Sequence, residues 1–143
     1  IGVVDVDYKN GVVIHKAYFK EPSTLDYNGI YKGKYVEFDA KECASKTSFP
    51  LSNIHLHQIK HIENIIRHGG IAFLIISING GYYLFKGSDL LQFIRNNDRK
   101  SIPYSLIQEI GYPLTYNYNI GIDYLKGIEE AYKGVGYFED TKD

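Results

Sequence analysis

The sequence predicts an α/β fold in which helices pack against a mixed central β-sheet. Two observations indicate this class. Strand-like segments with partial period-two alternation fill the first third of the chain. An amphipathic helical segment over 54–68 is then followed by a nearly continuous apolar run over 71–78, which is typical of a buried central strand. The chain has 143 residues, of which 44% are hydrophobic, and this suits one domain with a real core.

The first pair of strands is predicted to form a β-hairpin. Segments 3–8 and 12–19 both alternate partly between apolar and polar residues, and Lys9-Asn10-Gly11 lies between them. An Asn-Gly pair between two strand-like segments favours a tight turn. Residues 21–24, which include a proline, break the alternation and end the hairpin.

A second pair of strands is predicted over 24–31 and 34–41, with a turn near Gly33. Side chains alternate between the two faces of a strand, so the latter segment divides into two sets. One face carries Tyr35, Glu37, Asp39 and Lys41, and the other carries Val36, Phe38 and Ala40. The apolar set is expected to face the core. Asp39 and Lys41 then point the same way, about 7 Å apart along the strand.

Residues 45–53 are expected to form a loop, and Ser52 or Asn53 is expected to cap the helix that follows. The apolar residues of that helix recur at helical spacing and are Ile59, Ile62, Ile65 and Ile66. Gly69-Gly70 is expected to end it.

The remaining segments predict further strands and helices around the buried strand. Asn79-Gly80-Gly81 is expected to turn that strand into another over 82–85. Three helices are predicted to follow, over 89–96, 104–110 and 122–132. The polar residues from 134 to 143 are expected to form a flexible tail, which leaves 1–133 as a single domain.

The amino-acid composition argues against several classes of protein. The chain has no apolar run long enough to span a membrane and no basic start typical of a signal peptide, so a cytoplasmic location is expected. The single cysteine, Cys43, excludes an internal disulfide and a multi-cysteine zinc site. Because the sequence contains no methionine, we expect that an N-terminal element is missing.

The charges are unevenly distributed. The net charge is −1, but residues 8–68 contain nine Lys and Arg against six Asp and Glu, together with all five histidines. The remainder contains seven basic against eleven acidic residues. A partly basic region can follow a phosphate backbone, and a random scatter of surface lysines is the alternative.

The triplet Asp39-Ala40-Lys41, read together with Asp26, carries the clearest chemistry. Two carboxylates can hold a hard cation such as Mg2+, and an ammonium group beside them can face a phosphate. This combination suits hydrolysis of a phosphodiester bond. Acid-x-Lys triplets also begin at Asp7, Asp98 and Asp140, but these end at a turn or lie in a polar linker and the tail.

Contiguous motifs extend from Lys16 to Lys126 around this triplet. They comprise 17–24 (AYFKEPST), 26–29 (DYNG), 31–34 (YKGK), 38–42 (FDAKE), 46–51 (KTSFPL), Asn53, 55–58 (HLHQ), 101–103 (SIP), 111–113 (GYP) and 122–125 (IDYL). With these motifs the chain resembles the RecU family of Holliday junction resolvases, within the PD-(D/E)xK nuclease superfamily. The resemblance implies a restriction-endonuclease-like core with a projecting β-hairpin stalk over about 5–22.

The resemblance also implies roles for individual residues. Asp26 matches the first metal-binding aspartate, Asp39 stands where the family usually has glutamate, and Lys41 matches the catalytic lysine. The backbone carbonyl of Ala40 is implied as a further metal ligand. The implied cofactor is Mg2+, with Mn2+ as an alternative, and Gln58 is the best candidate for a helix residue that arranges water or phosphate.

Departures from the family pattern accompany the match. Asp39 shortens the carboxylate arm by one methylene, about 1.5 Å, which puts metal affinity or preference in doubt. Cys43 replaces a frequent threonine, and Ile54 replaces a phenylalanine. The family also carries an N-terminal helix with residues near the metal, which nothing in this sequence matches.

Other polar residues have two interpretations. Glu37 shares the Asp39 face and is either a supporting group or, more often at such a position, simply exposed. His57 and His61 have a spacing that zinc sites use, but no cysteine or carboxylate partner is apparent in the sequence, so metal binding is not expected there. Without the resemblance, an ordinary helix-surface amide is an equally good interpretation of Gln58 as a site residue.

DNA contacts are predicted in two regions. Lys46, Thr47 and Ser48 form a donor-rich loop suited to phosphates, whose alternative is an ordinary loop. Lys9, Lys16 and Lys20 lie on the hairpin that the family uses as a stalk at the centre of a four-way junction. Two-fold cleavage requires two sites, so the resemblance implies a symmetric homodimer.

The resemblance therefore predicts a Mg2+-dependent, structure-selective DNA endonuclease that resolves Holliday junctions in recombination and repair. Two alternatives stay open. One is another PD-(D/E)xK nuclease that acts on linear duplex or recombination intermediates. The other is a junction-binding accessory protein that has lost cleavage through the Asp39 change, since the family is also associated with modulating the RecA recombinase.

Overall fold

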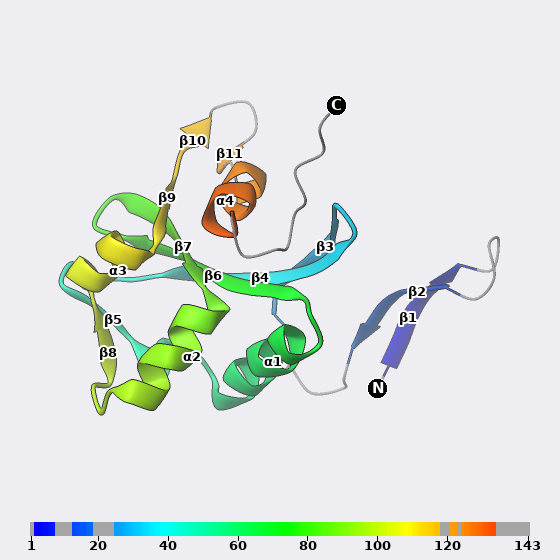
Figure 1. The fold of residues 1–143 in the computed structure, drawn as a ribbon, viewed down its shortest axis with the longest axis horizontal. Coiled ribbons are helices and arrows are strands. Elements are labelled where there is room, and N and C mark those ends of the chain that lie inside the picture. Colours follow the sequence, from blue (N-terminus) through cyan, green and yellow to red (C-terminus); the bar gives the residue numbers. More distant parts are fainter. Residues whose placement is uncertain (1, 8–12, 19–24, 118–120, 123, 134–143) are drawn as a thin grey trace.

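A five-stranded mixed sheet forms the centre of the protein in the computed structural model, which describes residues 2–7, 13–18, 25–117, 121–122 and 124–133 (Figure 1). The strand order is β3-β4-β6-β7-β9. The strands are β3 (Tyr27–Tyr31), β4 (Lys34–Glu42), β6 (Ile71–Ile78), β7 (Gly81–Lys86) and β9 (Tyr112–Leu114). Only the β4–β6 pair of this sheet is parallel, so the predicted mixed sheet is confirmed.

Helices cover both faces of the sheet, as Figure 1 shows. Helices α1 (Leu56–Arg67) and α2 (Gly87–Asn96) pack against one face, and α4 (Tyr124–Ala131) packs against the other. Helix α3 (Tyr104–Ile110) lies beside β7. The four predicted helices are confirmed within a few residues of their expected ends.

The core has two layers because β6 is buried on both faces. Ala72, Leu74, Ile76 and Ile78 join the apolar cluster under α1 and α2. Ile71, Phe73 and Ile75 join the cluster under α4. A strand covered on both sides has no polar face, which explains the continuous apolar run over 71–78.

Two tight turns follow the predictions. Lys32 and Gly33 join β3 to β4 with φ values of 49° and 78°, and Asn79 and Gly80 join β6 to β7 with 52° and 78°. Positive φ at both central residues is the geometry that favours two-residue hairpins, and glycine adopts it without steric cost.

Smaller strand pairs lie outside the main sheet. β1 (Gly2–Asp7) pairs with β2 (Val13–Tyr18), which confirms the first hairpin, although its turn lies outside the described residues. β5 (Ser48–Pro50) pairs with β8 (Ser101–Pro103), and β10 (Tyr116–Asn117) pairs with β11 (Gly121–Ile122).

Three local expectations were wrong. Residues 45–53 are not a plain loop, because they contain β5 and a 3-10 helix over Leu51–Asn53. The N-cap of α1 is His55 rather than Ser52 or Asn53, since that 3-10 turn occupies those positions first. Ala40 is exposed rather than part of the core, unlike Val36 and Phe38.

No helix in the described part of the chain is long and apolar enough to cross a membrane.

Candidate active site

The face of β4 that carries charged residues is covered by α1. Val36 and Phe38 point into the α4 layer, so the alternate residues Glu37, Asp39 and Lys41 point towards α1. Asp39 is only 2% exposed and Glu37 only 1%. Alternation in the sequence places these charged residues on the face of β4 away from the apolar set. In the structure, α1 covers that face.

Asp26 lies directly before β3 and faces the Asp39 position. The β3–β4 register ends with Tyr27 opposite Phe38, and its next step places Asp26 opposite Asp39. A hydrogen bond with the Asp39 carboxyl, together with the negative charge of Asp39 and burial, raises the pKa of Asp26, while the charge of Lys41 acts in the opposite direction. The two predicted metal ligands are thus brought together on adjacent elements.

Lys41 contacts both Asp39 and α1. Its Nζ lies 2.9 Å from Asp39 Oδ2 and donates a hydrogen bond of 3.3 Å to Gln58 Oε1. The Lys41 side chain remains 18% exposed. The ammonium group therefore has fixed partners on the protein side and retains access to solvent.

Gln58 links the helix start to the carboxylate. Its Nε2 donates a 3.1 Å hydrogen bond to Asp39 Oδ2, and its Oε1 accepts one from the His55 backbone N at 3.2 Å as part of a capping box. The side chain is 7% exposed. The alternative of an exposed helix-surface amide is wrong, because Gln58 is buried against β4.

The two carboxylates fit a divalent cation. Mg2+ is usually held by one or two carboxylates, and waters and substrate phosphates complete its octahedron. The hydrogen bond with Asp39 and, after it, the negative charge of Asp39 raise the pKa of Asp26, and a cation between the two carboxyl groups would favour both ionised forms. No group of three or more His, Cys, Asp or Glu side chains suited to a metal occurs among the described residues, so the two carboxylates need further oxygen ligands.

Glu37 and His61 form a pair that the sequence analysis missed. The expectation that Glu37 is simply exposed is wrong, and His61 does have a carboxylate partner. Glu37 Oε2 pairs with His61 Nε2 and accepts a 3.2 Å hydrogen bond from the Leu25 backbone N. Its Oε1 accepts a hydrogen bond from the Tyr35 hydroxyl. The signal was present, since Glu37 lies two residues from Asp39 on β4 and His61 lies three residues from Gln58 on α1.

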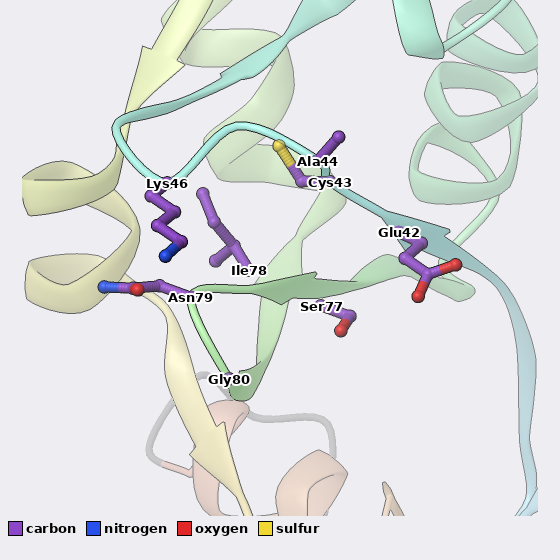
Figure 2. Close-up of a pocket in the computed structure, with 8 residues that line it drawn as sticks. All are labelled: Glu42, Cys43, Ala44, Lys46, Ser77, Ile78, Asn79 and Gly80. Carbon is purple, nitrogen blue, oxygen red and sulfur yellow. The ribbon is translucent and has the colours of Figure 1, made fainter.

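The predicted DNA-binding loop is compact and exposed. Ser45 Oγ accepts hydrogen bonds from the backbone N of Thr47 at 3.2 Å and of Ser48 at 3.4 Å. Lys46 and Thr47 are exposed, and Ser48 is half-buried. Lys46 lines a hollow of about 370 Å³ at the ends of β4 and β6, and Figure 2 shows its side chain extending towards Asn79.

The structure describes one of the three hairpin lysines that were predicted to bind DNA. Lys16 lies within β2, whereas Lys9 and Lys20 lie outside the described residues. Their proximity to DNA stays a prediction.

The two other departures from the family pattern, Cys43 and Ile54, are both buried. Cys43 is 9% exposed, and its Sγ contacts the backbone oxygens of Ser45 at 3.4 Å and Ser48 at 3.2 Å. Ile54 is 5% exposed within the apolar cluster under α1 and α2. Both residues therefore support the structure around the loop and the helix start.

Comparison with known proteins agrees with this geometry. The family model of recombination protein U, RecU, matches residues 1–130. Holliday junction resolvase RecU of Bacillus pumilus is 46% identical over 134 residues, which is 90% of this chain and 65% of that protein. The protein of the same name from a Geobacillus strain is 44% identical over 92% of this chain and 69% of that protein. The chain therefore spans about two thirds of the length of these relatives, and it belongs to the RecU family.

Proposed function

We propose that the chain is a divalent-metal-dependent endonuclease that resolves four-way DNA junctions. The observation that carries this proposal is the arrangement at the end of the β3–β4 pairing. Asp26 lies opposite Asp39, while Lys41 and Gln58 both contact Asp39 Oδ2. The relatives named Holliday junction resolvase RecU point to the same substrate.

The metal is proposed to be Mg2+, with Mn2+ as a substitute, held by Asp26, Asp39 and the backbone carbonyl of Ala40. β4 continues for four residues past Phe38, where its pairing with β3 ends, and Ala40 is exposed among the described residues, which supports a ligand at this position. When bound, the cation supplies an activated water and stabilises charge on the phosphate.

Lys41 and Gln58 have complementary roles in this proposal. The Lys41 ammonium offsets negative charge that develops on the scissile phosphate, an effect that is strong in a partly enclosed site. Gln58 contacts both Asp39 and Lys41 and fixes their separation, so α1 holds the two charged groups at a constant distance.

The DNA is proposed to contact two regions besides the metal site. Lys46, Thr47 and Ser48 bind phosphates of one arm, and Lys9, Lys16 and Lys20 meet the phosphates that converge at the junction centre. Such contacts position the DNA without reading base sequence. Symmetric resolution of a junction requires two sites, so the acting form is a homodimer in the cytoplasm.

Two alternative functions can be distinguished from junction resolution by experiment. A nuclease for linear duplex would use the same catalytic residues, and a junction-binding accessory protein, with RecA as its partner, would not need cleavage. The shortened Asp39 side chain is the observation that favours the latter, because it alters the reach of a metal ligand.

Incubation with a mobile four-way junction and a sequence-matched linear duplex, each with Mg2+ or Mn2+, tests these functions. We expect paired nicks in the junction and little cutting of the duplex. Equal cutting of both substrates favours the general nuclease. Tight junction binding without cleavage in either cation favours the accessory protein.

A further inference from the structure

We propose that Glu37 is a positioning residue that holds Asp26 opposite Asp39 through the backbone of Leu25. The inference rests on the metal site proposed above and adds a residue that does not itself touch the metal. It also gives a role to the pair formed by the buried Glu37 and the partly exposed His61.

The contacts of Glu37 use both of its carboxylate oxygens. Oε2 accepts the Leu25 N–H at 3.2 Å and pairs with His61 Nε2, and Oε1 accepts the Tyr35 hydroxyl. The residue is 1% exposed. Burial of a carboxylate is costly unless every oxygen is satisfied, so this arrangement fixes the carboxylate in one place.

Leu25 transmits that fixed position to Asp26. Leu25 is 3% exposed in the apolar cluster under α1 and α2, and its N–H is anchored on Glu37. On the other side of Asp26, Tyr27 pairs with Phe38 and begins β3. The backbone of Asp26 is therefore held at the residue before it and the residue after it.

Such anchoring is needed because the β3–β4 register ends with Tyr27 opposite Phe38, so Asp26 lies one residue beyond the last strand pair. Like charges directly opposite each other on neighbouring strands are destabilising, so Asp26 keeps its place opposite Asp39 only if its backbone is held. Asp26 is exposed, so packing contributes little to holding its side chain. The hydrogen bond from the Leu25 N–H to Glu37 is thus a polar contact that holds the chain next to Asp26 against β4 on the side facing α1.

Helix α1 supports both carboxylates in the same way. Gln58 contacts Asp39, and His61, one helical turn later, contacts Glu37. Residues 58 and 61 on α1 therefore face residues 39 and 37 on β4, respectively. The helix therefore orients one metal ligand directly and the other through Glu37 and Leu25.

The test compares Glu37→Gln with wild type, and Glu63→Gln on the exposed side of α1 serves as the matched control. A glutamine keeps only one acceptor oxygen for Leu25 and Tyr35 and presents an NH2 group beside His61. We expect the Mn2+ affinity, measured by calorimetry without DNA, to fall about tenfold, as is typical when a group behind a metal ligand is lost. The Leu25 amide should exchange with solvent about tenfold faster, and junction cleavage should recover to within a few-fold of wild type at saturating Mg2+.

Outcomes separate this inference from the proposed function. Unchanged Mn2+ affinity or unchanged Leu25 exchange in a folded Glu37→Gln variant overturns the positioning role, whatever happens to cleavage. Failure of the wild type to bind Mn2+ overturns the metal site itself. If Glu37→Gln does not fold, Tyr35→Phe, which removes one hydrogen bond to the same carboxylate, takes its place. We expect smaller shifts in the same two measurements, and their absence overturns the inference.

Discussion

Lys41 Nζ lies 2.9 Å from Asp39 Oδ2, although β4 alone would separate the two residues by about 7 Å. Their side chains therefore lean towards each other, and Gln58 on α1 contacts both. Asp39 and Lys41 thus form an ion pair within β4, and Gln58 on α1 sets the geometry of that pair.

Asp26→Asn is expected to abolish junction cleavage, because a neutral amide is a poor ligand for a divalent cation. Junction binding should persist or become tighter, since a negative charge near the phosphates is removed. Gel assays of cleavage and fluorescence anisotropy with a labelled junction measure the two effects. Loss of binding together with cleavage would count against the metal-site interpretation.

Lys41→Ala is expected to lower the cleavage rate by about 10²- to 10³-fold, the usual cost of removing one charge-stabilising group from an active site. The metal should still bind, because neither proposed carboxylate ligand is lost. Lys100→Ala is the matched control, since Lys100 ends another acid-x-Lys triplet and is exposed. Rates are compared at saturating Mg2+, and equal rates in wild type and Lys41→Ala would remove Lys41 from the mechanism.

Gln58→Ala is expected to reduce both cleavage and stability. Cleavage should fall about 10- to 100-fold, because Asp39 and Lys41 lose the group that fixes them. The free energy of unfolding should fall by about 1 kcal/mol through loss of the capping interaction with His55. Gln92→Ala on the exposed side of α2 is the control for both measurements. A Gln58 variant that cleaves at the wild-type rate would show that α1 does not position the site.

Gly87→Ala is expected to destabilise the protein by about 1 to 3 kcal/mol through overpacking. A Cβ at this position would lie 2.5 Å from the Ala72 carbonyl oxygen and 2.7 Å from an Ile62 methyl carbon. Gly29→Ala is the matched control, because a Cβ there meets nothing within 4 Å. Urea unfolding measures both variants, and similar midpoints for the two would contradict the packing at the start of α2.

Stability below neutral pH should depend on Glu129. Its carboxylate accepts hydrogen bonds from Lys32 Nζ and from the Tyr31 hydroxyl, the latter at 2.8 Å, and these lower the pKa of Glu129 from its ordinary value of 4.5. The stabilisation is present above pH 4.5 and is lost as the pH falls through the lowered pKa. Melting temperatures recorded from pH 6 to pH 3 should fall more steeply for wild type than for Glu129→Gln. Parallel curves would show that this contact does not stabilise the fold.

The sequence predicted most of the fold because its signals are local. Alternation, the Lys32-Gly33 and Asn79-Gly80 turns and the helical spacing of Ile62 and Ile65 each depend on neighbouring residues. The pairings of β5 with β8 and of β10 with β11 were missed because such short strands carry little periodicity. Ser52 and Asn53 are good capping residues, but tertiary contacts place them in a 3-10 turn instead.

The candidate site was predicted in part. Asp26, Asp39, Lys41 and Gln58 were identified from spacing and family resemblance, and the structure brings them together. Glu37 was misjudged because alternation assigns a residue to a face without showing what covers that face. Only the docking of α1 on β4 shows that Glu37 is buried against His61.

The division of β4 into two sets of alternate positions has a consequence for interpreting natural variants. The side chains of Val36 and Phe38 must fit the volume of the α4 layer. Those of Glu37, Asp39 and Lys41 must instead match the polar groups that they contact on α1 and, for Glu37, the Leu25 backbone N–H. Substitutions at the first set should therefore be compensated by size changes across the α4 layer. Substitutions at the second set should require coordinated changes at positions 58 and 61, so the two faces of one strand are expected to diverge under independent constraints.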